Sequence, residues 1–304
     1  NEVDVFNSVA TIGFFDGVHL GHKKILSEVV LKAKKMKTSS MAVTFWPHPR
    51  LVIGTDSNDL KLLSSLPERL GDIEAEGVDS VLIVNFSHEF AALSAADFVD
   101  SYLVKGLLVK HLLVGYNNNF GKNGEGNFDF LKTNESKFGF SAELVNPIDV
   151  DGVNVSSSKI RAALERGNVD FANRMLGRFY EVTGTIEGGK QIGRAIGFPT
   201  ANISPTENLK QIPGFGVYAV WVGVDDKSYP AMLNIGVKPT IASNLDRTIE
   251  AHIIGFNQNI YSKEVKVRFV SKIRDEMRFP SLNHLKSQLA EDKRRVLGVL
   301  GINE

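Results

Sequence analysis

Short apolar runs alternate with segments of helical periodicity over the first half of the chain, from residue 9 to about residue 155. This alternation is typical of βα units around a parallel sheet. The predicted strands are 9–14, 41–45, 80–85, 112–115 and 141–145, and the predicted crossover helices are 23–35, 67–76 and 95–102. Ligands of such sheets bind beyond the carboxyl ends of the strands, so the loops that follow the strands carry the functional information.

The pattern changes after Gly177. Runs of strand-forming residues separated by glycine, asparagine and aspartate occupy 180–188, 216–224, 228–235, 249–255 and 264–271. In the last run apolar residues alternate with charged ones, as in a half-buried strand. These runs predict a small antiparallel barrel, closed by a helix from about 281 to 300 whose apolar face docks on it. We therefore predict an α/β domain over residues 1–179 and a barrel domain over residues 180–304.

Composition narrows the class of protein. A chain of 304 residues that is 43% hydrophobic favours two domains. It has no cysteine, which excludes disulfides and cysteine catalysis and fits a cytoplasmic location. Nothing near Asn1 reads as a signal peptide. A net charge of zero gives no global field for nucleic acid or a membrane, and a monomer or weak homo-oligomer is expected.

The stretch 11–24, TIGFFDGVHLGHKK, reads as the end of a strand, a turn and the start of a helix. His19 and His22 are three residues apart at this helix start, so they share a face with its free N–H groups and its positive dipole end. Glycines that let a polyphosphate approach the backbone occur at Gly13, Gly17 and Gly21. The pattern predicts a phosphate site. Packing or capping histidines are the alternative, and zinc is a lesser one because no further ligand is evident.

Three other segments are candidates on similar grounds. The loop Pro47-His48-Pro49, too rich in proline to begin a helix at once, is either a structural turn or part of a site. Asn117 lies in an asparagine-rich turn after a strand, where amides satisfy turn geometry or read a ring edge or ribose. The serines at 156–158 open a helix expected to run to about residue 176. They are N-cap residues or, with Lys159 and Arg161, a second anion site.

The HxGH of residues 19–22, preceded by GFFDG, resembles the signature of the nucleotidyltransferase superfamily. In that superfamily the histidines hold the ATP phosphates and stabilise the transition state of adenylyl transfer. The resemblance implies a reaction class and leaves the acceptor open.

Residues 193–203, GRAIGFPTANI, closely resemble the riboflavin kinase motif, in which a PTAN turn places threonine and asparagine on Mg²⁺ and the ATP phosphates. With the HxGH segment, nearly the whole chain resembles the bacterial bifunctional riboflavin kinase and FMN adenylyltransferase family, also called FAD synthetase. That resemblance implies a Rossmann-like nucleotidyltransferase domain followed by a barrel kinase domain. It implies conversion of riboflavin to FMN and of FMN to FAD, with ATP as co-substrate and Mg²⁺ as cofactor.

The resemblance also implies site residues. Catalytic roles fall on Glu250, as general base of the kinase, and on His19, His22 and Arg161. The implied ATP contacts are Gly13, Phe14, Phe15, Asp16, Gly17, His19, Gly21, His22, Ser157, Ser158 and Arg161 in the first domain, and Gly193, Thr200 and Asn202 in the second. Thr200 and Asn202 are the implied metal ligands. The flavin contacts are Pro47, His48, Asn117 and Arg274.

Asn118 departs from the family pattern, because it stands where the family has a phenylalanine. If that aromatic contacts flavin or adenine, the sequence predicts a weakened adenylylation site. Two rival interpretations remain open. An adenylyltransferase with another acceptor, such as a pantetheine phosphate or a nicotinamide nucleotide, leaves 193–203 and the barrel unexplained. A flavin-binding protein without turnover is favoured only by Asn118.

Overall fold

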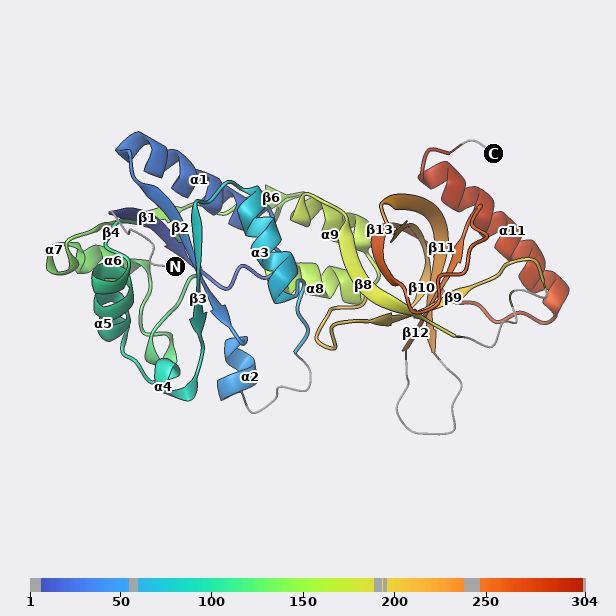
Figure 1. Cartoon of the computed structure of the whole chain (residues 1–304), viewed down its shortest axis with the longest axis horizontal. Helices are drawn as coiled ribbons and strands as arrows, with labels where there is room; N and C mark the ends of the chain where they lie inside the picture. Colours follow the sequence, from blue (N-terminus) through green and yellow to red (C-terminus); the bar gives the residue numbers. More distant parts are fainter. Residues whose placement is uncertain (1–6, 55–59, 189–192, 194–195, 238–246, 303–304) are drawn as a thin grey trace. The chain divides into compact units, whose positions relative to one another are not determined.

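The computed structural model describes residues 7–54, 60–188, 193, 196–237 and 247–302 (Figure 1). Two compact units divide the chain, residues 1–157 and 158–304. The division falls at the start of the helical segment that we expected, as one helix to about residue 176, in the first domain, whereas the predicted boundary is at residues 179 and 180. As a limit between two catalytic domains, that boundary stays a prediction.

The first unit is built on a five-stranded sheet in the order β3-β2-β1-β4-β5, with every neighbouring pair parallel. Its strands are β1 (Ser8–Ile12), β2 (Ser39–Trp46), β3 (Ser80–Asn85), β4 (Val109–Gly115) and β5 (Ser141–Val145). All five predicted strands are confirmed. β1 is buried along its whole length, as a central strand covered on both faces should be.

The order of the strands reverses between β1 and β4, because β2 and β3 extend to one side of β1 while β4 and β5 extend to the other. This is the topological switch point, where α/β sheets bind ligands beyond the strand ends. The loops after β1 and β4 are therefore the first place to look for a site. They contain the GFFDG and asparagine-rich segments singled out above.

Helices and short segments connect these strands (Figure 1). They are α1 (Leu20–Met36), α2 (Pro49–Ile53), α3 (Leu66–Ala75), α4 (His88–Ala91), α5 (Ala95–Phe98) running into a π-helical segment (Val99–Gly106), a 3₁₀ turn (Lys122–Gly124), α6 (Phe128–Thr133), α7 (Glu135–Phe138) and the hairpin of β6 (Asp149–Val150) and β7 (Val153–Asn154). The expectation that the proline-rich loop begins no helix is wrong. Pro49 opens α2 directly, because proline suits the first helical position, where an N–H would have no partner.

The single helix expected to run to residue 176 is also wrong. Two helices, α8 (Ser157–Glu165) and α9 (Val169–Leu176), are separated by Gly167. This glycine has φ +74°, and a Cβ atom there would lie 2.6 Å from the Tyr218 hydroxyl oxygen. Helical periodicity continues through the break, which is why the pattern did not show it.

The second unit is a closed six-stranded barrel with neighbours in the order β10-β11-β12-β9-β8-β13. Its strands are β8 (Tyr180–Glu187), β9 (Ala201–Pro205), β10 (Gly216–Val224), β11 (Lys227–Val237), β12 (Arg247–Ile253) and β13 (Glu264–Arg274), and α11 (Leu282–Val299) follows. The predicted barrel and terminal helix are confirmed. Strand β9 was not predicted, because it begins inside the PTAN string, whose residues favour turns. The outer face under α11 is a cluster that includes Val217, Met232, Ile273 and Val296.

No helix in the described ranges is both long enough and apolar enough to cross a membrane.

Candidate active sites

The HxGH segment begins α1 at the carboxyl end of β1. His19 is the N-cap residue, and its Nδ1 accepts a hydrogen bond from the backbone N–H of His22 at 3.3 Å. The two imidazole rings stack with centroids 3.6 Å apart and planes 15° apart. Because Nδ1 of His19 accepts, the hydrogen of its neutral ring lies on Nε2. The structure thus brings both histidines onto one face of the helix start, as the sequence predicted.

His22 carries an unusual polar atom. Its Nδ1 is buried and has no hydrogen-bond partner in the described part of the chain. Burial, with smaller contributions from His19 and Arg69, lowers the pKa of His22 well below its ordinary value. His22 is therefore neutral near pH 7, and a neutral imidazole keeps one N–H donor for a ligand.

The turn before the helix is tightly held. The carboxylate of Asp16 accepts hydrogen bonds from the backbone N–H groups of Leu63 at 2.9 Å and Ser64 at 3.1 Å. Gly17, with φ +80°, donates its N–H to the Ser64 hydroxyl at 2.9 Å. Asp16 therefore anchors the loop in the structure, and its predicted contact with ATP stays a prediction.

Close ring packing surrounds the histidines. The buried Phe15 ring meets His22 edge-on with centroids 5.3 Å apart. A Cβ atom on Gly13 would lie 3.1 Å from the Phe15 ring, and one on Gly21 would lie 3.2 Å from the His19 ring. Both positions leave little room for a side chain, in keeping with a backbone that a ligand approaches.

The proline-rich loop joins this site. His48 is the N-cap residue of α2, and its ring meets Phe14 edge-on with centroids 4.2 Å apart. The structure therefore brings the predicted flavin-side loop of Pro47 and His48 next to the predicted phosphate loop. This loop can be both a structural turn and part of a site, because the capping hydrogen bond of His48 fixes where its ring points.

Arg69 is a neighbour that sequence reasoning missed. It belongs to α3, is fully buried, and places its guanidinium carbon 3.9 Å from the centroid of Phe14. Its Nη1 donates to the Phe45 carbonyl at 3.3 Å, but Nε and Nη2 have no partner among the described residues. Burial lowers the pKa of Arg69 to about 10, and the charge of Asp16 opposes that shift. The sequence held no signal, because an arginine on an amphipathic helix is normally exposed.

The loop after β4 reaches the end of β1 through Asn118. Its side-chain amide donates to the Ile12 carbonyl at 2.8 Å. This bond crosses the switch point, and the sequence did not foresee it. Asn117 precedes it and is exposed, as a residue must be to meet a ligand.

Of the predicted serine and arginine element, Ser157 belongs to the first unit, where its hydroxyl donates to the Asp16 carbonyl at 3.0 Å. Ser158 and Arg161 belong to the second unit. There Nη2 of Arg161 donates to the Ser158 hydroxyl at 3.4 Å. Their predicted roles at ATP stay predictions.

The barrel brings the predicted kinase residues together. Asn202 of β9 is the register partner of Glu250 on β12, which in turn is the partner of Asn234 on β11. On its other side Asn202 pairs with Glu187 of β8. Directly opposed residues of neighbouring strands point to the same face of a sheet, so these four side chains form one row of alternating amides and carboxylates. Glu187 and Asn234 were not predicted, because pairing partners cannot be read without the register.

Thr200 stands just before this row and is exposed. The Phe198 N–H donates to the Gly193 carbonyl at 2.8 Å, and a Cβ atom on Gly193 would lie 2.2 Å from the Phe198 carbonyl oxygen. Gly193 is thus required by the shape of the turn that presents Thr200. Arg194 and Ala195, which also belong to the motif, lie outside the described residues.

The side chain of Arg274 is paired with a carboxylate in the structure. Its Nε and Nη2 both donate to the buried carboxylate of Asp292 on α11, at 3.0 and 2.8 Å. The pair fastens the terminal helix to the end of β13. Contact between Arg274 and flavin, predicted from the sequence, stays a prediction.

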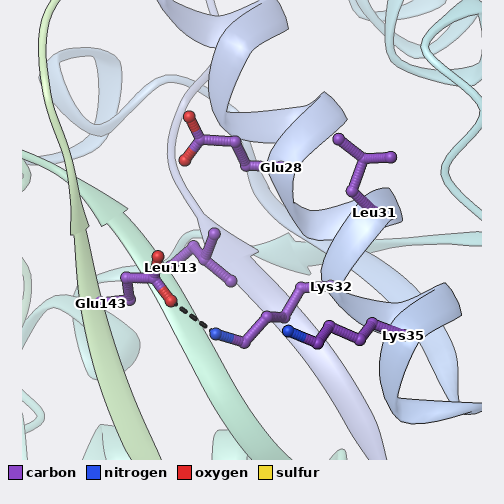
Figure 2. Close-up of a pocket in the computed structure, with 6 residues that line it drawn as sticks. All are labelled: Glu28, Leu31, Lys32, Lys35, Leu113 and Glu143. Atoms are coloured by element: carbon purple, nitrogen blue, oxygen red, sulfur yellow. Dashed lines mark hydrogen bonds and ion pairs between the residues drawn. The ribbon is translucent and has the colours of Figure 1, made fainter.

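A shallow groove of about 320 Å³ lies elsewhere on the first unit, between α1 and strands β4 and β5 (Figure 2). Its lining consists of Glu28, Leu31, Lys32, Lys35, Leu113 and Glu143. Lys32 is paired with Glu143 at 2.7 Å, the dashed line in Figure 2. None of the predicted site residues lines this groove.

Comparison with known proteins assigns the two parts of the chain to two family models. The chain matches the FAD synthetase family model over residues 3–159 and the riboflavin kinase family model over residues 176–300. It is 39% identical to the bifunctional riboflavin kinase/FMN adenylyltransferase of Pseudomonas fluorescens, over 93% of this chain and 90% of the relative. The corresponding protein of Bacillus subtilis is 35% identical, over 95% and 92%.

The likeness extends to a solved structure. A crystal structure named as a macrolide-efflux protein from Streptococcus pneumoniae superposes with a TM-score of 0.88 at 30% identity, covering 96% of this chain and 95% of that one. That name describes the Streptococcus protein alone. The superposition shows that this chain has the same fold.

Proposed function

This chain belongs to the bifunctional riboflavin kinase/FMN adenylyltransferase family, and we propose which of its residues carry the two reactions. The enzyme phosphorylates riboflavin to FMN and adenylylates FMN to FAD, with ATP as the second substrate of each step. The rival acceptors for adenylyl transfer are set aside, because a riboflavin kinase model matches the barrel that they left unexplained.

Adenylyl transfer belongs to the HxGH site. A phosphate oxygen of FMN attacks the α-phosphorus of ATP, the bond from that phosphorus to the bridging oxygen breaks, and pyrophosphate leaves. The attacking oxygen is already ionised, so catalysis is positioning and charge stabilisation. The stacked histidines at the switch point are the observation that carries this assignment. Their ring N–H groups and the backbone N–H groups at the start of α1 are proposed to hold the triphosphate, and the role of Arg161 that the resemblance implies stays a prediction.

The flavin is proposed to lie on the side of Pro47, His48 and Asn117. Two observations support this position. His48 is already packed against Phe14 of the phosphate loop. Asn117 follows β4, the other neighbour of β1, so both segments lie at strand ends beside the phosphate loop.

Riboflavin phosphorylation belongs to the row on the barrel. Glu250 is proposed to take the proton of the ribityl 5′-hydroxyl as its oxygen attacks the γ-phosphorus of ATP, and ADP leaves. Thr200 and Asn202 are proposed to hold the ATP phosphates and the metal. The pairing of Asn202 with Glu250 supports this, because it puts base and phosphate ligand on one face.

Mg²⁺ is the proposed cofactor of both steps. Its fit can be judged from the donors, since magnesium prefers oxygen ligands and keeps several waters. Thr200 and Asn202 offer a hydroxyl and an amide oxygen beside the carboxylate of Glu250. When bound, the ion neutralises charge on the phosphates. No group of three or more acidic or histidine residues that could hold a metal occurs in the described ranges, in keeping with an ion held largely by ATP and water.

We further propose that the enzyme works in the cytoplasm as a monomer or weak homo-oligomer, without nucleic acid or membrane. The balanced charge and absence of cysteine support this.

Chromatographic separation of flavins after incubation with riboflavin, Mg²⁺ and ATP tests the function. FMN followed by FAD is expected. FMN alone would place the deficiency in the HxGH site, and no FMN would contradict the kinase assignment. Omitting Mg²⁺ and adding EDTA should stop both steps.

A further inference from the structure

His252 is a buried residue that neither the motif nor the assigned chemistry uses. It lies on β12 two residues after Glu250, so the two side chains share a face of the strand. Its side chain is only slightly exposed, and its Nδ1 lies 2.8 Å from the Pro199 carbonyl oxygen. A carbonyl oxygen only accepts, so Nδ1 carries the hydrogen and donates it.

The ring of His252 is also fixed by packing. It meets Phe198 with ring centroids 5.3 Å apart and planes 63° apart. Phe198 in turn packs into the cluster of Val217, Met232 and Val296 beneath α11. The segment before Thr200 is therefore held twice, by a ring contact at Phe198 and by a hydrogen bond at Pro199.

This hold acts directly on the ATP-binding residues. The Pro199 carbonyl is part of the planar peptide that also contains the Thr200 nitrogen, so fixing the oxygen fixes the plane from which Thr200 projects. Proline has a single preferred φ, which leaves the peptide one main degree of freedom to be fixed. Two residues further on, Asn202 enters β9 opposite Glu250.

We propose that His252 is a positioning residue of the kinase site, whose Nδ1–H holds the Pro199 carbonyl and so sets Thr200 and Asn202 against the Mg-ATP phosphates beside Glu250. The proposal rests on the kinase function assigned above. His252 itself touches no substrate, and its effect is on the affinity for ATP and the alignment of the γ-phosphate.

Two substitutions distinguish positioning from packing. In His252→Asn the amide nitrogen hangs from Cγ, as Nδ1 does, so the donor is kept. In His252→Gln the amide nitrogen matches Nε2 instead, so the donor is displaced while size and polarity are preserved. The kinase kcat and the KM for ATP are measured for both variants, with adenylylation of supplied FMN by the same protein as internal control.

We expect His252→Gln to lower kinase kcat/KM for ATP about five- to tenfold, mainly through KM, the scale set by one hydrogen bond. His252→Asn should stay within about threefold of the parent. FMN adenylylation should be unchanged in both variants. Equal kinase activity in the two variants would overturn the proposal, whereas a parent protein that forms no FMN would overturn the proposed function instead.

A spectroscopic measurement covers the case in which His252→Gln does not fold. In the parent protein with ¹⁵N-labelled histidine, the signal lost in His252→Asn identifies His252. A protonated Nδ1 whose resonance shifts when Mg-ATP is added supports the proposal. A protonated Nε2, or no shift with saturating Mg-ATP, overturns it.

Discussion

Asn202 lies directly opposite Glu250 in the pairing of β9 with β12, so an amide and a carboxylate from segments far apart in sequence meet on one face of the barrel. Replacing Glu250 by glutamine keeps the shape of this pair and removes the base. We expect Glu250→Gln to lower the rate of riboflavin phosphorylation about 10²- to 10⁴-fold, the usual contribution of a positioned base. Initial rates of FMN formation measure this.

Supplied FMN should still become FAD in Glu250→Gln, because the HxGH site lies in the other unit. Asn234→Ala, on the other side of Glu250, is the matched control for disturbance of the row. Parent-like phosphorylation by Glu250→Gln would exclude Glu250 as the base.

His22→Ala should slow FAD formation and leave FMN formation intact. Removing one preorganised donor to the phosphates is expected to lower FAD formation about 10²- to 10³-fold, while FMN accumulates. Product analysis with riboflavin as the starting substrate shows both effects at once. Loss of both activities in a folded variant would argue against two separate sites.

The pH dependence of this loss is a further check on His22. Its lowered pKa means that His22 stays neutral as the pH falls through its ordinary value near 6.5. The ratio of parent to His22→Ala rates is therefore expected to be constant between about pH 8 and pH 6. A ratio that changes with a midpoint near 6.5 would show that the ring is charged in the working enzyme.

The sequence predicted the elements that follow from periodicity and the sites that follow from motifs. The parallel strands and the placement of His19 and His22 on one face needed only local pattern, because a strand shows period two or an apolar run and a helix start fixes neighbours three apart. Where local signals conflict with long-range pairing, the prediction failed. Strand β9 begins within turn-forming residues and exists because it pairs with β8 and β12.

Contacts between side chains from distant segments were beyond reach for the same reason. The spacing of residues along the sequence predicts neither the burial of Arg69 against Phe14 nor the hydrogen bond from Asn118 to Ile12. At the helix break, Gly167 has no room for a Cβ atom beside the hydroxyl of Tyr218, a residue of β10. Each of these depends on three-dimensional packing that a single sequence does not specify.

The sequence predicted a weakened adenylylation site if the aromatic residue that Asn118 replaces contacts flavin or adenine. In the structure the Asn118 amide links the ends of β4 and β1, so we expect Asn118→Leu, which keeps the size and loses the bond, to lower FAD formation about five- to tenfold. Kinase activity should not change. Asn119→Leu is the control, since Asn119 is the exposed neighbour. Asn118→Phe tests the earlier expectation directly, and faster FAD formation in that variant would restore it.

The bidentate pair of Arg274 and Asp292 predicts a stability effect that separates it from flavin binding. Asp292 is fully buried, and removing its charge leaves Arg274 without a counterion in a largely dry site. Asp292→Asn is expected to destabilise the barrel by about 3 to 5 kcal/mol, as for other broken buried pairs. Denaturant unfolding measures this. A stable variant with weakened riboflavin binding would instead favour the flavin role of Arg274.

Replacing the buried Arg69 is expected not to destabilise the protein, in contrast to replacing Asp292. The contact of Arg69 with Phe14 contributes up to about 2 kcal/mol as a desolvated cation–π pair. Nε and Nη2 of Arg69, which have no partner among the described residues, each cost about 1 to 3 kcal/mol. The costs equal or exceed the gain, so Arg69→Met, which fills the same space without charge, should leave the midpoint of unfolding of the first unit unchanged or raise it.

Adenylylation is the informative second measurement on the same variant. Arg69 supports Phe14, and Phe14 contacts His48 of the proposed flavin loop, so FAD formation should fall even though stability does not. Lys23→Met, which removes a partly exposed lysine paired with Glu76, serves as a matched change of charge on another helix. A loss of stability above about 1 kcal/mol in Arg69→Met would show that the hydrogen bond to Phe45, the charge of Asp16 and the contact with Phe14 outweigh the cost of burying the guanidinium.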